Sequence, residues 1–232
     1  MNAVNTQDPF ASARAGIVVI GRNEGRRLAA CLASAIRCDR PMVYVDSGSV
    51  DESVDIARHM GVDVVALDAS QPYTAARGRN AGFEHLIQVH PDLQYVQFID
   101  GDCVLRDDWL DVGVVALNAR QDAAMACGRV RERYPNSSVY NRICELEWKQ
   151  PVGDVDRCGG NFVVRVAAFR EVGGFDAGVI AAEDTDFCTR LRLSGWSIIS
   201  LDADMVLHDA AMTKASQWFR RALRAGHALT EG

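Results

Sequence analysis

The feature that most constrains the fold is an alternation of short apolar runs, rich in β-branched residues, with longer stretches that repeat their apolar residues at helical spacing. The first run covers residues 16–20. The stretch after it, 25–37, carries Leu28, Leu32 and Ile36 on one helical face. Strands that alternate with helices at this interval form βαβ units, whose parallel strands are covered by helices on both faces. The sequence therefore predicts an α/β fold with a Rossmann-like, mostly parallel central sheet.

The remaining elements follow the same alternation, less regularly in the second half. We expect further strands at 41–45, 62–67, 94–99, 123–130, 161–166, 196–201 and 205–208. We expect further helices at 51–60, 75–88, 107–118, 139–149, 183–194 and 213–229. This order predicts an N-terminal tail at 1–14, a single domain at 15–210 with halves at 15–120 and 121–210, and a C-terminal helical segment at 211–232.

Charge and cysteine usage exclude some classes of function. The net charge is −6 and the basic residues are dispersed, which argues against a nucleic-acid partner. The chain has seven cysteines, but no pair is spaced as in zinc-binding motifs, so we expect small buried side chains in a reduced compartment. The start of the chain does not resemble a signal peptide, and no apolar run approaches the roughly 20 residues of a membrane span. We therefore expect a cytoplasmic protein.

The C-terminal helix is basic and amphipathic. Its apolar residues fall mainly on one face and its basic residues elsewhere: Trp218, Phe219, Ala222, Leu223 and Leu229 against Lys214, Arg220, Arg221 and Arg224. Such a helix either packs on the domain or binds the surface of a membrane. Both remain open, the second as peripheral contact with the inner face of the membrane.

Polar residues follow three of the predicted strands, where ligands bind in open α/β sheets. Asp100 and Asp102 follow the strand at 94–99. Two residues apart on an extended segment, they would point to the same side, as a hard divalent cation requires of its oxygen ligands. Gly101 would let the backbone approach a ligand closely. The alternative is a polar turn without a ligand.

Other candidates each have a structural alternative. Asp46 could bind a ligand or close an Asx turn. Arg77 and Arg79, beside glycines at a helix start, suit a diphosphate but could be a solvated face. Glu183 and Asp184 could include a catalytic base or only cap a helix.

Taken in order, the polar segments resemble family 2 glycosyltransferases of the GT-A fold over residues 15–228. The matching segments are 17–24 (IVVIGRNE), 45–51 (VDSGSVD), 76–82 (ARGRNAG), 98–102 (FIDGD), 159–165 (GGNFVVR), 173–176 (GGFD) and 183–191 (EDTDFCTRL). The resemblance implies an inverting, metal-assisted transfer from a nucleoside-diphosphate sugar, with 15–120 as the nucleotide-sugar-binding half and 121–210 as the acceptor half. It also implies a role in polysaccharide biosynthesis at the cell envelope, and a glycan or lipid-linked acceptor.

The resemblance also assigns roles to residues. Asp46 would bind the base, Arg79 and Arg77 would lie along the nucleotide, and Asp100 would contact the ribose or sugar. Asp102, with His208, would hold Mg²⁺ or Mn²⁺, and Asp184, paired with Glu183, would be the general base. The other residues expected to bind the nucleotide sugar are Asn23, Glu24, Asn80, Gly101, Gly160 and Asn161.

Two positions depart from the family pattern. Arg22 stands where many members have a tyrosine or an aliphatic residue, and Ser47 replaces the second Asp of the common Asp-Asp-Gly-Ser. The second departure bears on the nucleotide, for which we expect UDP rather than GDP. Two other functions remain as alternatives. One is a phosphatase of the haloacid dehalogenase type, which also uses Asp-x-Asp, and the other is a catalytically inactive nucleotide-sugar-binding domain.

Overall fold

The computed structural model of the chain describes residues 14–179 and 181–228. Its strands are β1 (Ala15–Gly21), β2 (Met42–Asp46), β3 (Asp63–Ala66), β4 (Tyr95–Asp100), β5 (Cys103–Leu105), β6 (Ala123–Glu132), β7 (Gly153–Asp154), β8 (Phe162–Arg165) and β9 (Ser197–His208). Its helices are α1 (Arg26–Ile36), α2 (Ser53–His59), α3 (Ala75–Val89), α4 (Trp109–Ala119), α5 (Val139–Glu147), α6 (Val166–Glu171), α7 (Glu183–Leu193) and α8 (Ala215–Ala228).

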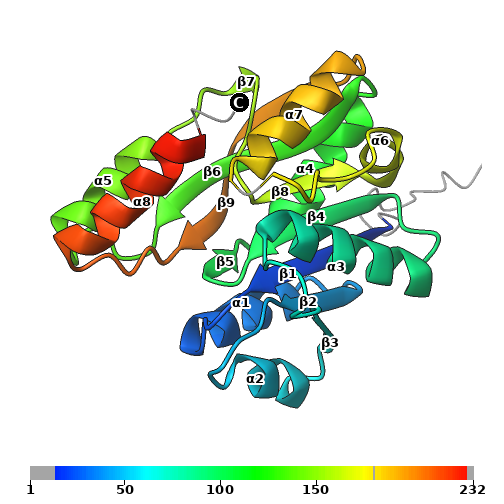
Figure 1. The fold of residues 1–232 in the computed structure, drawn as a ribbon. Helices are drawn as coiled ribbons and strands as arrows, with labels where there is room; N and C mark the ends of the chain where they lie inside the picture. Colours follow the sequence, from blue (N-terminus) through cyan, green and yellow to red (C-terminus); the bar gives the residue numbers. More distant parts are fainter. Residues whose placement is uncertain (1–13, 180, 229–232) are drawn as a thin grey trace, which may run out of the picture.

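All the strands of the described residues join one sheet that runs through both halves of the chain (Figure 1). Its order is β3-β2-β1-β4-β8-β6-β9-β5, and β7 pairs with β9 beside this path. β1, β2, β3, β4, β6 and β9 share one direction, while β5, β7 and β8 run against them. The predicted α/β fold with a mostly parallel central sheet is confirmed.

Helix α3 lies unusually close to the sheet because of its glycines. A Cβ on Gly82 would stand 2.3 Å from Val18 of β1 and 2.9 Å from Val45 of β2, and one on Gly78 would touch Ile20. These glycines therefore bring the helix against β1 and β2. The expectation that they serve as flexible neighbours of a diphosphate needs correcting, since both face the core.

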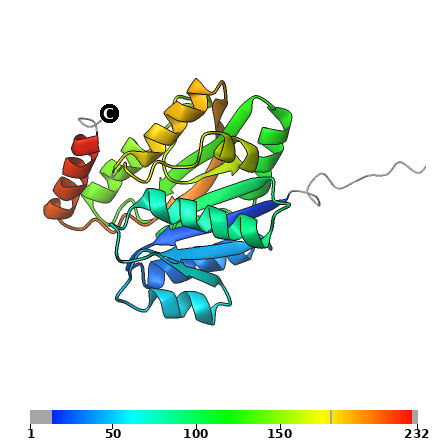
Figure 2. The same ribbon diagram turned by 45° about the vertical axis from the view of Figure 1, so that its right-hand side comes forward.

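Aromatic packing joins the two halves on the face that carries α3, α6 and α7 (Figures 1 and 2). Phe83 of α3 stacks on Phe169 of α6 with ring centroids 4.0 Å apart, and Phe175 stacks on Phe187 of α7 at 4.5 Å. Phe98 of β4 and Phe162 of β8 lie within the same cluster. Buried aromatic side chains contribute large apolar areas, so this cluster fixes α7 against the nucleotide half.

The structure departs from the predicted elements in a few places. It adds the short β5, β7 and α6, and it merges the strands predicted at 196–201 and 205–208 into the single strand β9. Asp202 and Asp204 break the apolar pattern of that strand, but both pair with Arg129 of β6. Pairing of β6 with β9 continues past them through register shifts.

The ends of the chain bear on two predictions. The tail predicted at 1–14 lies outside the described residues except for Arg14, and so do Leu229 and the side chain of Arg224. Helix α8 lies beside α5 in both views of the fold (Figures 1 and 2). Among the described residues, no helix has the length and apolar character needed to cross a bilayer.

Candidate active site

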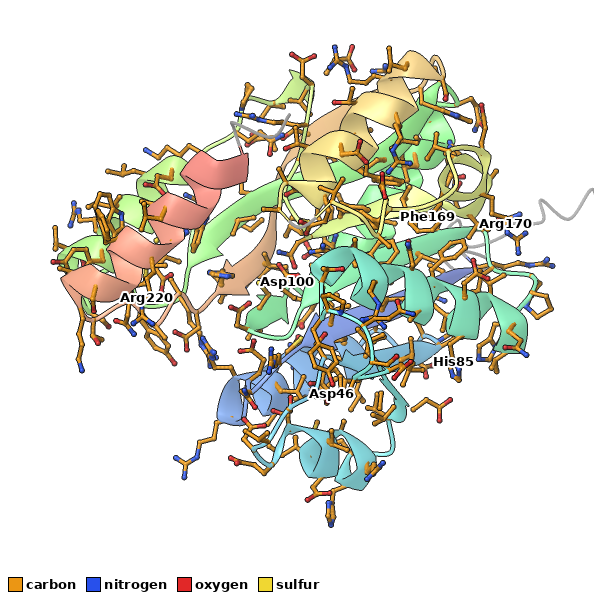
Figure 3. All side chains as sticks on the ribbon, in the orientation of Figure 1. Asp46, His85, Asp100, Phe169, Arg170 and Arg220 are labelled. Carbon is orange, nitrogen blue, oxygen red and sulfur yellow. The ribbon has the colours of Figure 1, made fainter. Side chains whose placement is uncertain are left out.

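Asn23 ties the loop after β1 to the loop after β2, and Asp46, labelled in Figure 3, closes the turn of the second loop. Asn23 has a positive φ of 57°, its backbone N–H donates to Ser49 Oγ, and its side chain accepts from Val50 N at 2.8 Å. The Asp46 carboxylate accepts from the hydroxyl of Tyr44 at 3.0 Å and from the backbone N–H groups of Gly48 and Ser49. Asp46 thus closes the turn that was one of its two predicted roles, and it is only 4% exposed.

Asp100 and Asp102 occupy different environments, contrary to the expectation from their spacing. β4 ends at Asp100, and Gly101 and Asp102 form a turn rather than an extended segment. Gly101 is buried, and a Cβ there would stand 3.2 Å from the carbonyl oxygen of Ile20 and from the side chain of Glu24. Because Gly101 has no side chain, β1 and the loop after it pack against this position, where we expected a ligand.

Asp102 lies beside His208 because β5 pairs antiparallel with the end of β9. This pairing sets Cys103 opposite His208, and the backbone N–H of Asp209 donates to the carbonyl of Asp102 at 3.0 Å. As a result, His208 Nε2 stands 3.3 Å from Asp102 Oδ2, with each side chain about one fifth exposed (20% and 21%). Two residues more than a hundred positions apart become neighbours through one short strand.

The Asp102–His208 pair has the electrostatics of an ion pair. Burial works to raise the pKa of Asp102, but the hydrogen bond and charge of His208 outweigh it, and the pKa lies below its usual value. Burial works to lower the pKa of His208, but Asp102 outweighs it, so this pKa lies above its usual value. His208 Nδ1 is buried and has no hydrogen-bond partner among the described residues.

The chemistry of these groups fits a hard divalent cation. Two atoms that bind neighbouring positions of an octahedral ion, each about 2.1 Å from it, lie roughly 3 Å apart. His208 Nε2 and Asp102 Oδ2 lie 3.3 Å apart, which is close to that separation. The thiol of Cys103 also lies close enough to share an ion. Burial and the charge of Asp102 raise the pKa of this thiol well above its usual value, and sulfur is a soft ligand that hard cations do not favour. Only Asp102 and His208 therefore suit Mg²⁺ or Mn²⁺.

Arg79 is a buried bridge between the two halves. Its guanidinium contacts Asp100 Oδ1 at 2.9 Å and Glu183 Oε1 at 2.7 Å, and the arginine is 3% exposed. It lies over the ring of Phe175 and against Gly160, where a Cβ would stand 2.1 Å from Nη2. Both ion pairs hold the guanidinium away from solvent, and its place along the nucleotide stays a prediction.

The other predicted side chains divide into two groups. Asn161 belongs to the site, since its Oδ1 accepts from Asp100 N at 3.0 Å and its Nδ2 donates to Asp100 Oδ2 at 3.3 Å. Asn80 instead holds the turn before α7 through two bonds with Phe175 N and O. Arg77 donates to backbone carbonyls of residues 68, 71 and 72, so it ties down the loop before α3.

Glu24 faces the two aspartates from the end of β1. It pairs with Arg27 at 2.6 Å, and its side chain is 15% exposed. Burial, followed by the negative charge of Asp102, raises its pKa to about 7. Three carboxylates thus share this edge of the sheet, an arrangement that a cation would stabilise.

Asp184 is the first-turn carboxylate of α7 that faces open space. It lines a pocket of about 570 Å³ together with Gly159, Thr185 and the segment that follows α5. Burial, followed by the charge of Glu183, raises the pKa of Asp184. Its neighbour Glu183 is bound to Arg79, so the two acidic residues have separate positions: Glu183 toward the bridge and Asp184 toward the pocket.

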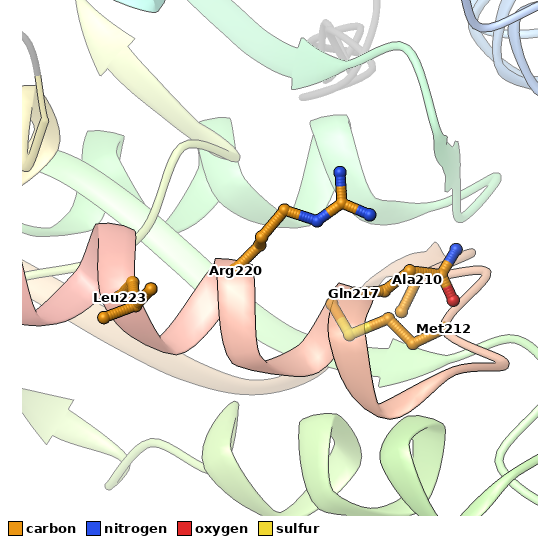
Figure 4. Close-up of a pocket in the computed structure, with 5 residues that line it drawn as sticks. All are labelled: Ala210, Met212, Gln217, Arg220 and Leu223. Carbon is orange, nitrogen blue, oxygen red and sulfur yellow. The ribbon is translucent and has the colours of Figure 1, made fainter.

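A second hollow, of about 680 Å³, begins two residues after His208 (Figure 4). It is lined by Ala210 and Met212 of the loop and by Gln217, Arg220 and Leu223 of α8. Figure 4 shows Arg220 projecting from the helix. The hollow therefore carries one positive side chain, that of Arg220.

Comparison with known families bears on the functions that the sequence left open. The sequence model of the family described as glycosyl transferase family 2 matches residues 16–173. This range contains β1 to β8 and with them most of the site.

The chain belongs to glycosyl transferase family 2.

One curated relative of this glycosyl transferase family 2 chain is glycosyltransferase AglE of Haloferax volcanii. It is 25% identical over 205 residues, which make up 82% of this chain and 64% of that protein. The chain thus spans less than two thirds of the length of this relative.

Solved structures share the fold of this family 2 chain. Mannosyltransferase PcManGT of Pyrobaculum calidifontis, solved with GDP-Man and Mn²⁺, has a TM-score of 0.71 at 19% identity, over 97% of this chain and 65% of that one. Residues 1–349 of TarS from S. aureus, solved with UDP, have a TM-score of 0.64 at 14% identity, over 89% of this chain and 62% of that one. The GT-A fold expected from the sequence is therefore confirmed.

Two aromatic residues at the family 2 site escaped the sequence analysis. Tyr73 lies against Gly48 and beneath Arg22, whose guanidinium carbon is 5.1 Å from the ring centroid. Trp148 meets His208 edge to face, with ring centroids 4.4 Å apart. No pattern in the sequence singles them out, since Tyr73 falls in a loop and Trp148 just past the end of α5.

Proposed function

We propose that the chain transfers a sugar from a nucleoside-diphosphate sugar to an acceptor hydroxyl, with inversion at the anomeric carbon. The observation that supports this proposal most is that a candidate cation site and a candidate base are connected through the side chain of Arg79. Asp102 and His208 form a pair that suits a divalent cation, and Asp184 lines an open pocket. Arg79 connects them by binding both Asp100 and Glu183.

On the donor side, Asp102 and His208 would hold Mg²⁺ or Mn²⁺. When bound, the cation supplies positive charge to the diphosphate that leaves the sugar. Asp46 and Asn23 would keep the loops at 22–24 and 47–50 in place beneath the nucleotide. The relatives bind GDP-Man with Mn²⁺ in one case and UDP in another, and we favour UDP-sugars for this chain.

On the acceptor side, Asp184 would take the proton of the attacking hydroxyl. A base must lie within hydrogen-bond reach of that proton, and a carboxylate with a raised pKa is the stronger base. The hydroxyl oxygen forms a bond to the anomeric carbon as the bond to the diphosphate oxygen breaks. Attack from the face opposite the leaving group inverts the configuration without a covalent enzyme intermediate.

We also propose a setting for the reaction. The acceptor would be a glycan or a lipid-linked sugar in polysaccharide biosynthesis of the cell envelope. Helix α8 leaves Phe219 and Leu223 each 57% exposed, next to Arg220, which suits peripheral contact with an anionic membrane.

The experiment that tests this function follows release of nucleoside diphosphate from UDP- and GDP-sugars in Mn²⁺. The wild-type chain should release nucleoside diphosphate slowly without an acceptor, and Asp184→Asn should lower transfer by about 10²–10⁴-fold while still binding the donor. An Asp184→Asn variant that transfers at the wild-type rate would restrict this residue to capping α7. Release of inorganic phosphate from sugar phosphates would instead support the phosphatase alternative.

A further inference from the structure

The pocket beside Asp184 has a charge pattern that none of the comparisons explains. Besides Asp184, its lining includes the carboxylates Glu147, Asp154 and Asp156 and the cations Lys149 and Arg157. Most of these residues belong to the segment between α5 and β8, which passes beside β9 through the short strand β7. The segment thus supplies one wall of the pocket, and Asp184 and Thr185 supply another.

Three of the four carboxylates form ion pairs with arginines, although Arg120 is shared between Asp154 and Asp122. Asp154 pairs with Arg120 at 3.1 Å, Asp156 pairs with Arg192 at 2.9 Å, and Glu147 pairs with Arg221 of α8. Each of these arginines lies outside the lining of the pocket. The carboxylates therefore contribute little negative charge to a ligand in the pocket, apart from Asp184.

The two basic side chains that line the pocket, in contrast, have no ionic partner among the described residues. Lys149 and Arg157 form no ion pair with any described side chain, and both are exposed at the pocket. The side-chain amide of Gln150 donates to the backbone carbonyl of Arg157, which fixes the backbone there but leaves the guanidinium free. The pocket consequently offers two unpaired positive groups opposite a single carboxylate.

The position of the pocket indicates that the acceptor would contact the basic side chains of Lys149 and Arg157. Trp148 lines it and also touches His208, so one wall adjoins the proposed cation site. A Cβ on Gly159 would stand 3.9 Å from Asp184 Oδ2, and the glycine leaves that carboxylate accessible. A hydroxyl group in the pocket could therefore reach both the base and the donor sugar, as the acceptor must.

We propose that the acceptor is a carbohydrate with an anionic group, bound by Lys149 and Arg157 while its accepting hydroxyl meets Asp184. This inference rests on the proposed function and names its acceptor class. Charged hydrogen bonds to a carboxylate or phosphate are stronger than those to neutral hydroxyls. A neutral acceptor would leave both cations unpaired.

The anionic group could be the carboxylate of a uronic acid or a phosphate on a sugar, and matched probes separate the two. Methyl β-glucuronide carries the carboxylate, glucose 6-phosphate carries the phosphate, and methyl β-glucoside carries neither. Binding of each is measured by calorimetry, with Mn²⁺ and UDP or GDP present to fill the donor site. We expect at least one anionic probe to bind about tenfold or more tightly than the neutral glucoside, because charge-assisted hydrogen bonds are stronger than neutral ones.

The variant that tests the assignment is the double substitution Lys149→Met with Arg157→Met, which keeps an unbranched, somewhat shorter side chain and removes both charges. It should lose the preference for the anionic probe, whereas Arg58→Met, at an exposed arginine of α2 without an ion pair among the described residues, should keep it. Circular dichroism and the melting temperature check that both variants fold.

Equal binding of all three probes by the wild type would overturn the inference, and so would a preference that persists in the double variant. The proposed function has its own readout, which is release of nucleoside diphosphate by the wild type. Release without a preference for anionic probes contradicts only the acceptor class. Absence of release contradicts the proposed function itself.

Discussion

At the scale of single residues, the two aspartates at the end of β4 have different partners although they are separated by one glycine. Asp100 is held by Arg79 and Asn161, and Asp102 by His208. Each partner comes from another element: α3, the loop before β8, and the end of β9. The account therefore assigns Asp100 to the bridge between the halves and Asp102 to the cation.

The bridge yields a prediction about Arg79. Arg79→Met should destabilise the chain by roughly 3–5 kcal/mol, because it leaves Asp100 and Glu183 as unpaired, part-buried charges. Gly160→Ala should act through the same bridge, since its Cβ would stand 2.1 Å from Arg79 Nη2. Urea unfolding measures both, with Gly159→Ala as the control, because a Cβ there meets nothing closer than 3.9 Å. Equal stability of the two alanine variants would contradict a rigid bridge.

Glu24 yields a prediction about pH. Its pKa of about 7 in the folded chain lies above the value of 4.5 for an unperturbed glutamate. Between these values the folded form keeps a proton that the unfolded form has lost, so stability should fall as the pH rises from about 4.5 to about 7. Glu24→Gln should remove this loss, which is on the order of 2 kcal/mol. Urea unfolding at pH 5 and pH 8 tests this prediction. If the free energy of unfolding of Glu24→Gln differs between the two pH values as much as that of the wild type, the assignment is wrong.

The types of residue at the site could be predicted from the sequence, but their pairing could not. Asp46 and Asp102 lie at the carboxyl ends of β2 and β4, as predicted, and Asp184 lies in the first turn of α7. That Arg79 would bind Glu183 depends on packing between residues 104 positions apart. Spacing along the chain carries no information about such a contact, which also explains why Trp148 went unnoticed.

At the scale of elements, long runs with a regular period were predicted well and short ones were missed. β1, with nearly every residue buried, and α3, with 15 residues, match their predicted ranges closely. β5 has three residues, too few to show a period, yet its pairing with β9 brings Asp102 to His208. The shortest elements thus contribute most to the site and least to the sequence pattern.

Helix α8 yields a prediction about membranes. Its inner side packs on α5, where Arg221 pairs with Glu147 and lies 5.9 Å from the ring centroid of Trp148. Phe219 and Leu223 remain exposed, as does Arg220. The chain should therefore sediment with anionic liposomes at low salt and be released at high salt, which screens the attraction. Phe219→Ser with Leu223→Ser should weaken sedimentation. A wild-type chain that stays in the supernatant at low salt would make α8 purely structural.

At the scale of the whole molecule, one sheet and one aromatic cluster make the two halves a single body. The proposed donor site combines Asp102 of the first half with His208 of the second, and Arg79 of the first half binds Glu183 of the second. Neither half holds a complete site. This arrangement explains why the alternation of strands and helices predicted the fold, whereas the site required the folded chain.

The central claim is that the chain binds a nucleoside diphosphate through a divalent cation held by Asp102 and His208. Calorimetry of UDP and GDP binding, with and without Mn²⁺, tests it most directly when the wild type is compared with Asp102→Asn. We predict that Mn²⁺ strengthens the binding of one of the two nucleotides to the wild type. This gain in affinity should be lost in Asp102→Asn, whereas the melting temperature of the variant without Mn²⁺ should stay close to that of the wild type. An Asp102→Asn variant that binds the nucleotide in Mn²⁺ as tightly as the wild type would contradict it.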